Sequence, residues 1–181
     1  RLTLNPIAHL DPVGTFLLFL VGFGWGKPVP VNEFRLRHGR YSMALVAVAG
    51  PLSNFLTAWA LSVPIKLELV AWRSPFTFTG RIASAEEFLA LFLGFGIFFN
   101  LILGIFNLLP LSPLDGSKVL RGLVPYPGTR WLLRIEALGP VLLIGLIAID
   151  FLTGFGIFGR IIGPVVNWFS TILIDRSIFM N

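Results

Sequence analysis

The chain has 181 residues, of which 55% are hydrophobic and 13% charged, and its mean hydropathy is +0.84. Soluble domains carry about 25% charged residues, so this composition excludes a soluble enzyme and a disordered chain and indicates an integral membrane protein. The net charge of +5, without a dense Lys/Arg run, favours basic loops beside a lipid bilayer over nucleic-acid binding, and the lack of cysteine excludes disulfides and Cys-based metal sites.

The first predicted helix covers residues 12–26, with Asp11 as its N-cap and Pro12 in its first turn. About 20 apolar residues are needed to cross roughly 30 Å of hydrocarbon, and this helix is shorter. We therefore expect it to be re-entrant, to lie where the bilayer is thinned, or to be shielded by protein. His9 lies two residues before Asp11. This pair either touches a metal or is structural, and the structural role is the more common one.

An extended segment is predicted at Pro28-Val29-Pro30-Val31. Proline at alternate positions favours an extended chain and removes amide donors from one edge, while Lys27, Val29 and Val31 keep theirs on the other edge. The residues themselves favour a rigid loop here, and the alternative is that this half-blocked strand pairs with an extended peptide substrate.

Three later stretches are apolar enough to cross a membrane, namely residues 42–65, 88–114 and 137–159. The first two contain no charged residue. The third is interrupted only by Asp150, which is either a buried relay group or a residue near a frayed helix end.

The last segment, residues 160–181, places most of its apolar side chains on one helical stripe, with Ser170 away from that stripe. It is either an amphipathic interfacial helix or a final span. We therefore predict an all-α, polytopic membrane helix bundle with a broken helix before Asp115. Its core covers residues 1–159, and a C-terminal helix covers residues 160–181.

Lysine and arginine content gives an expected orientation. The loop over residues 27–40 and the loop after Leu114 hold four basic residues each, whereas the intervening loop holds three. We place the first and last of these loops in the cytosol and the middle loop outside.

The span over residues 88–114 runs into the sequence Asn107-Leu-Leu-Pro110-Leu-Ser-Pro113-Leu-Asp115-Gly116. The prolines break the helix, and broken backbone at membrane depth persists only inside protein or beside a water-filled cavity. A carboxylate there is costly unless it meets a cation or a partner, so Asp115 is a candidate metal ligand or relay. The alternative is that Asp115 caps the helix that follows it.

A second motif, Gly50-Pro51-Leu-Ser-Asn54, lies inside an apolar span and predicts an interruption of the helix there. Asn54 follows Gly50 by one turn and either faces a polar site or makes an interhelical hydrogen bond of about 0.6–2 kcal/mol. Small residues nearby are expected to admit a neighbouring helix, namely Ala44, Ala47, Ala49 and Ser53.

Together these motifs resemble the site-2 protease family of intramembrane zinc metalloproteases, in its compact bacterial form. The resemblance covers about residues 1–125 and rests on blocks in the family's order, at residues 1–15, 25–32, 49–54 and 106–116. It implies a multi-pass protein of the bacterial plasma membrane with a Zn²⁺ site toward the cytosol. There the family cleaves membrane-tethered protein substrates with a zinc-activated water, in regulated intramembrane proteolysis.

The resemblance also implies roles for single residues. Asp115 matches the family's zinc-binding aspartate, and Asn54 is a candidate catalytic donor to the oxyanion or to the substrate backbone. Substrate contacts are implied for Pro28, Val29, Pro30, Val31 and Asn54. The site would be shaped by Gly50, Pro51, Asn107, Pro110 and Gly116.

The family's other zinc ligands are the two histidines of a His-Glu-x-x-His helix, and residues 1–181 contain no such motif. In the family that motif precedes the block matched by residues 1–15. We therefore expect an N-terminally truncated enzyme that supplies one of three zinc ligands and is inactive alone. The alternatives are a catalytically inactive relative and a membrane transporter, which would show two related halves. The sequence sets no oligomeric state.

Overall fold

The computed structural model describes residues 5–21, 26–27, 31, 36–37, 39–78, 80–125 and 129–179. These residues form helices joined by turns, which confirms the all-α prediction. Contacts divide the chain into two units, Arg1–Arg35 and Leu36–Asn181.

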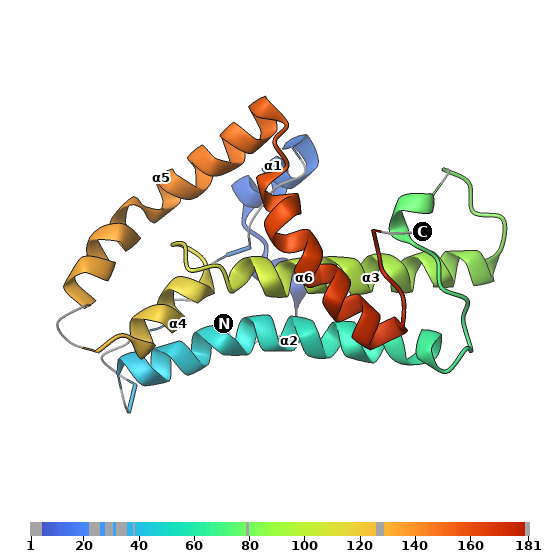
Figure 1. Ribbon diagram of the computed structural model, residues 1–181, viewed down its shortest axis with the longest axis horizontal. Helices are drawn as coiled ribbons and strands as arrows, with labels where there is room; N and C mark the ends of the chain where they lie inside the picture. The colour runs from blue at the N-terminus through green and yellow to red at the C-terminus, as the bar shows by residue number, and fades with distance from the viewer. Residues whose placement is uncertain are drawn as a thin grey trace. The chain divides into compact units, whose positions relative to one another are not determined.

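Four helices of the described chain are long and apolar enough to cross a membrane. They are α2 (Arg40–Lys66), α3 (Ala85–Asn107), α5 (Thr129–Thr153) and α6 (Ile157–Ile174) (Figure 1). Large apolar side chains such as Leu56 on α2 are exposed on them, as a surface toward lipid requires. The prediction of a polytopic membrane protein is confirmed.

In the first unit, the 3-10 helix η1 (Pro6–His9) precedes α1 (Pro12–Val21). Asp11 caps α1 as predicted, because its Oδ1 accepts from the amides of Val13 at 3.1 Å and Gly14 at 2.9 Å. This role favours the structural interpretation of the His9–Asp11 pair. The helix expected to reach Gly26 is shorter: Gly26 instead pairs with Leu10 in an antiparallel bridge.

Helix α2 runs through Gly50-Pro51 without interruption, so the break predicted there is wrong. A proline removes one backbone donor, and the other hydrogen bonds of this 27-residue helix carry the chain past it. Pro51 is fully buried, so its ring also gains packing contacts. Of the small residues expected beside a neighbouring helix, Ala44 and Ala47 are buried, whereas Ala49 and Ser53 are exposed.

The core of the second unit lies where α2, α3 and α6 meet. Helices α2 and α3 lie side by side and α6 packs across them (Figure 1). Ala58, Ile97, Leu101 and Val166 have no exposed surface. Because lipid tails are as apolar as these side chains, close packing rather than hydrophobic transfer holds the helices together.

The buried face of α6 consists of Ile162, Val166, Ser170 and Ile174. The predicted stripe placed Ser170 elsewhere, and this is corrected: its hydroxyl donates to the Asn167 carbonyl at 2.9 Å, so it can be buried without an unpaired donor. The helix starts at Ile157, and the domain division at residue 159 stays a prediction.

Two turns set the ends of helices in this unit. Helix α3 ends at Asn107, so the span predicted to reach Leu114 is helical over less of its length, and α4 (Asp115–Leu123) follows. Between α5 and α6, the Asp150 carboxylate accepts from the amides of Ile157 at 2.5 Å and Phe158 at 3.3 Å. Asp150 therefore caps α6, which gives it a structural role.

Candidate functional site

Asp115 is the first residue of α4, directly after the N-cap residue Leu114. A carboxylate in the first turn is stabilised by the unpaired amides of the helix start. Its Oδ1 lies 2.8 Å from Nζ of Lys118, one turn further on, and 29% of the Asp115 side chain is exposed. The carboxylate is thus accessible and already holds a cationic group.

The second carboxylate oxygen of Asp115 faces α2. A Cβ placed on Gly50 would lie 3.2 Å from Oδ2, so a residue without a side chain lets the carboxylate approach α2. Asn54 is four residues further on, hence on the same face of α2, and is half-buried. Within the described chain, its side-chain amide makes no hydrogen bond. Two of the sequence motifs therefore meet at this face of α2.

Glycines allow the close approach of α4 to its surroundings. A Cβ on the buried Gly116 would lie 2.2 and 2.3 Å from the carbonyl oxygens of Leu108 and Leu109, which no real structure tolerates. A Cβ on Gly122 would lie 2.4 Å from that of Ala44. These close contacts fix both α4 and the turn that precedes it, and thereby the position of Asp115 at the start of α4.

The remaining shaping residues lie where α3 ends. The Asn107 Nδ2 donates to the Leu103 carbonyl at 2.9 Å, so this side-chain amide is hydrogen-bonded within its own helix, α3. Pro110 is exposed in the following turn, where the Leu111 amide donates to the Leu109 carbonyl at 2.8 Å. That Asn107 and Pro110 shape the site stays a prediction.

The predicted substrate-binding segment falls largely outside the description. Pro28, Val29 and Pro30 are not among the described residues, and Val31 is exposed. The amide of Lys27, expected to be free for a substrate, donates to the His9 carbonyl at 2.7 Å. The pairing of this segment with a peptide substrate stays a prediction.

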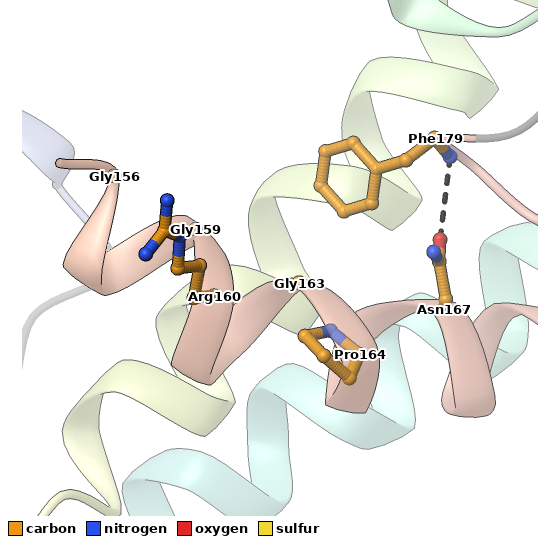
Figure 2. Close-up of a pocket in the computed structure, with 7 residues that line it drawn as sticks. All are labelled: Gly156, Gly159, Arg160, Gly163, Pro164, Asn167 and Phe179. Carbon is orange, nitrogen blue, oxygen red and sulfur yellow. Dashed lines mark hydrogen bonds between the residues drawn. The ribbon is translucent and has the colours of Figure 1, made fainter. Parts of the chain in front are cut away.

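A hollow of about 580 Å³ lies along α6, away from these motifs. Figure 2 shows its lining, which consists of Gly156, Gly159, Arg160, Gly163, Pro164, Asn167 and Phe179. Asn167 Oδ1 accepts from the Phe179 amide at 3.3 Å. No carboxylate or histidine is present in this described lining. The candidate site is therefore the region around Asp115 and not this hollow.

Sequence reasoning missed three charged residues on and around α4. Lys118 stands three residues after Asp115, a spacing at which helical side chains meet, so it could have been found. Arg121 and Glu136 join α4 to α5, with Nη1 3.5 Å from Oε2. Glu136 directly precedes a predicted apolar span, and a carboxylate in that position requires a partner.

Comparisons with known proteins agree with the motifs. Residues 66–137 match the family model described as Peptidase family M50. Over 130 residues the chain is 43% identical to "Putative zinc metalloprotease YwhC" of Bacillus subtilis (strain 168), a match that covers 72% of this chain and 56% of that relative. The match thus spans little more than half of the relative's length. No solved structure matches the chain. The resemblance to the site-2 proteases is confirmed.

The relative's name raises the question of zinc. In the part of the chain that the structure describes, no group of three or more His, Cys, Asp or Glu side chains is placed to hold a metal ion. Protein zinc sites use three or four such ligands. The described residues therefore do not form a complete metal centre, and Asp115 as a zinc ligand stays a prediction.

Proposed function

We propose that this chain, whose residues 66–137 match the model of peptidase family M50, is the membrane-embedded part of an intramembrane zinc metalloprotease. Its substrates would be membrane-tethered proteins, cleaved in regulated intramembrane proteolysis. The observation that carries the proposal is the Asp115 carboxylate at the start of α4, which lies against Gly50 of α2.

In this proposal Asp115 is a zinc ligand. Support comes from its partial exposure and from the position of its Oδ1, which already faces the cationic Lys118. Gly50 gives the carboxylate room, Pro51 beside it in the chain is buried, and Gly116 allows the turn that leads to it. Asn54, one turn along α2, would donate its amide to the substrate backbone or to the developing oxyanion.

The other ligands of the metal would come from a His-Glu-x-x-His motif. The gene sequence tests the source of these ligands directly. A His-Glu-x-x-His motif encoded a few tens of residues before Arg1 would support the protease. A methionine codon at the position of Arg1 supports the catalytically inactive relative. On the protease interpretation, residues 1–181 alone would neither hold zinc tightly nor cleave peptides.

Asp115→Asn tests the ligand role in the full-length gene product. The zinc content of the purified protein and the cleavage of a casein reporter tethered by one transmembrane helix should fall together. Asp175→Asn is the control, because this exposed carboxylate lies on the C-cap of α6. Full zinc occupancy in the Asp115→Asn protein would remove Asp115 from the ligand set.

Val29→Pro tests the substrate strand. Proline at this position removes an amide from the edge expected to pair with substrate, so cleavage of the tethered reporter should be lost while zinc content stays unchanged. Unchanged cleavage would leave the segment as a rigid loop.

Cysteine labelling tests the proposed orientation of the chain in the membrane. With no cysteine in the chain, single cysteines near Arg37 and near Ser84 report only on their own positions. An impermeant thiol reagent applied to intact bacteria should label the cysteine near Ser84 and leave the one near Arg37 unlabelled. The reverse pattern would move the proposed site to the outside of the plasma membrane.

A further inference from the structure

Helix α4 is held from two sides. On one side, Gly122 approaches Ala44 of α2 and Asp115 approaches Gly50. On the other side, Arg121 of α4 meets Glu136 of α5, with Nη1 3.5 Å from Oε2. These two side chains are only 21% and 18% exposed. An ion pair that is largely buried thus joins α5 to the helix that begins with Asp115.

The second oxygen of Glu136 is buried without a hydrogen-bond partner among the described residues. A cavity of about 10 Å³ touches Glu136, Ser112 and Ser117, which is the space of about one water molecule. Burying a charged pair costs desolvation energy, and an apolar pair of similar volume often packs at least as stably. Stability alone is therefore a poor reason for a carboxylate at this position.

Backbone contact reinforces the same junction. A Cβ on Gly139, one turn after Glu136, would lie 2.3 Å from Cβ of Ser112 and 2.6 Å from its carbonyl oxygen. Helix α5 therefore presses on the turn that leads into Asp115. Further along α5, large side chains such as Val141, Ile144 and Phe151 are exposed. Glu136 and Gly139, in the first half of α5, thus contact α4 and the turn before Asp115, respectively.

We propose that Glu136 and Arg121 are positioning residues for Asp115. The ion pair fixes α5 on α4, and Gly139 then supports the turn before Asp115, so that the carboxylate stays against Gly50. Both side chains act through the backbone of α4. The inference rests on the proposed function, since that function gives Asp115 its role.

Glu136→Gln tests the pair because it keeps the shape of the side chain and removes its charge. Spin labels on cysteines introduced at Leu123 and Leu133, both exposed, report the distance between α4 and α5. We expect a broadened distance distribution in the full-length protein. The kcat on the tethered casein reporter should fall at least about tenfold with KM unchanged, because small displacements of catalytic groups cost up to about a hundredfold.

Two further variants complete the experiment. Arg121→Lys keeps the charge and should retain most of the kcat and the narrow distance distribution. Asp175→Asn removes one partner of an exposed ion pair at 3.9 Å and should change neither quantity. Labels at Leu56 and Leu103 report whether α2 and α3 remain packed, which separates a local release of α5 from unfolding.

A wild-type label distance in Glu136→Gln overturns the inference, whether or not kcat falls, because the residue then does not hold α5. A displaced α5 with wild-type kcat overturns it too, because Asp115 then does not depend on the junction. The label measurement needs neither metal nor substrate. An inactive wild-type protein would therefore sink the proposed function, while the distances still decide whether Glu136 holds α5.

Discussion

Two lysine–aspartate pairs lie along α2, and they differ in distance, exposure and surroundings. Asp115 and Lys118 lie 2.8 Å apart beside Gly50, with about a third of each side chain exposed. Lys66 and Asp175 lie 3.9 Å apart at the end of α2, where the exposed fractions are 50% and 77%.

The second pair has a sufficient structural explanation. Lys66 also donates to the Ile172 carbonyl at 3.0 Å, as a cation near the end of a helix commonly does. Asp175 is the left-handed C-cap of α6. The comparison teaches that an ion pair alone says little, whereas backbone packed tightly around a carboxylate by glycines marks a position that cannot be rearranged.

Among the variants that test this comparison, Gly116→Ala should have the largest effect. The new Cβ would overlap two backbone carbonyl oxygens at 2.2 and 2.3 Å, which cannot rotate away. We expect the free energy of unfolding to fall by about 3 kcal/mol, measured by reversible unfolding in detergent. The control is Gly145→Ala, with open space around it in α5, which should gain about 0.5–1 kcal/mol. Equal stability of the two variants would contradict the tight turn.

Gly50→Ala should affect activity more than stability. Its Cβ would lie 3.2 Å from Oδ2 of Asp115, so the carboxylate must shift by a few tenths of an ångström. Cleavage of the tethered reporter should fall about tenfold, because catalytic geometry tolerates little displacement. The free energy of unfolding should change by less than about 1 kcal/mol, since alanine favours the helix. Wild-type cleavage would show that Asp115 needs no access to this face of α2.

Lys118→Met sharpens the difference between the two pairs. Methionine fills similar space without charge, so the Asp115 carboxylate loses a partner at 2.8 Å. Because both groups are about one-third exposed, we expect a loss of only about 0.5–1 kcal/mol in the free energy of unfolding. A loss several times larger would mean that the pair is effectively buried.

The smallest effect is expected from Asp175→Asn. Asparagine tolerates the left-handed backbone at this position, where φ is 55°, and the lost ion pair is exposed. The free energy of unfolding should stay within about 0.5 kcal/mol of the wild-type value. If this variant were as damaging as Lys118→Met, the contrast between the two pairs would not hold.

Local chemistry explains what could be predicted at the helix ends. Asp11 caps α1 because its carboxylate needs only the amides two and three residues further on, and sequence spacing contains that information. Pro51 shows the opposite case. The break predicted from its missing donor did not occur, because the other hydrogen bonds of α2 continue past the ring, and local sequence does not show that this ring is buried.

The candidate site was predictable only in part for the same reason. Asp115 stood out because a carboxylate after a proline-rich end of an apolar span is unusual. Its neighbour across space, Gly50, belonged to a separate motif with no spacing that relates the two. Glu136 was overlooked because its partner Arg121 lies on another helix, beyond the reach of any local pattern.

The sequence by itself predicted the membrane class, most of the long apolar helices and the resemblance to the family, and it singled out Asp115 as a candidate, because composition, periodicity and motif chemistry act within a few turns of chain. Only the tertiary structure decided that α2 continues past Pro51, that Ser170 is buried, that Asp115 lies against Gly50, and that Arg121 of α4 pairs with Glu136 of α5. The physical reason is that lipid solvates every apolar face alike. Which faces meet is therefore settled by shape and by the few polar groups that must find partners.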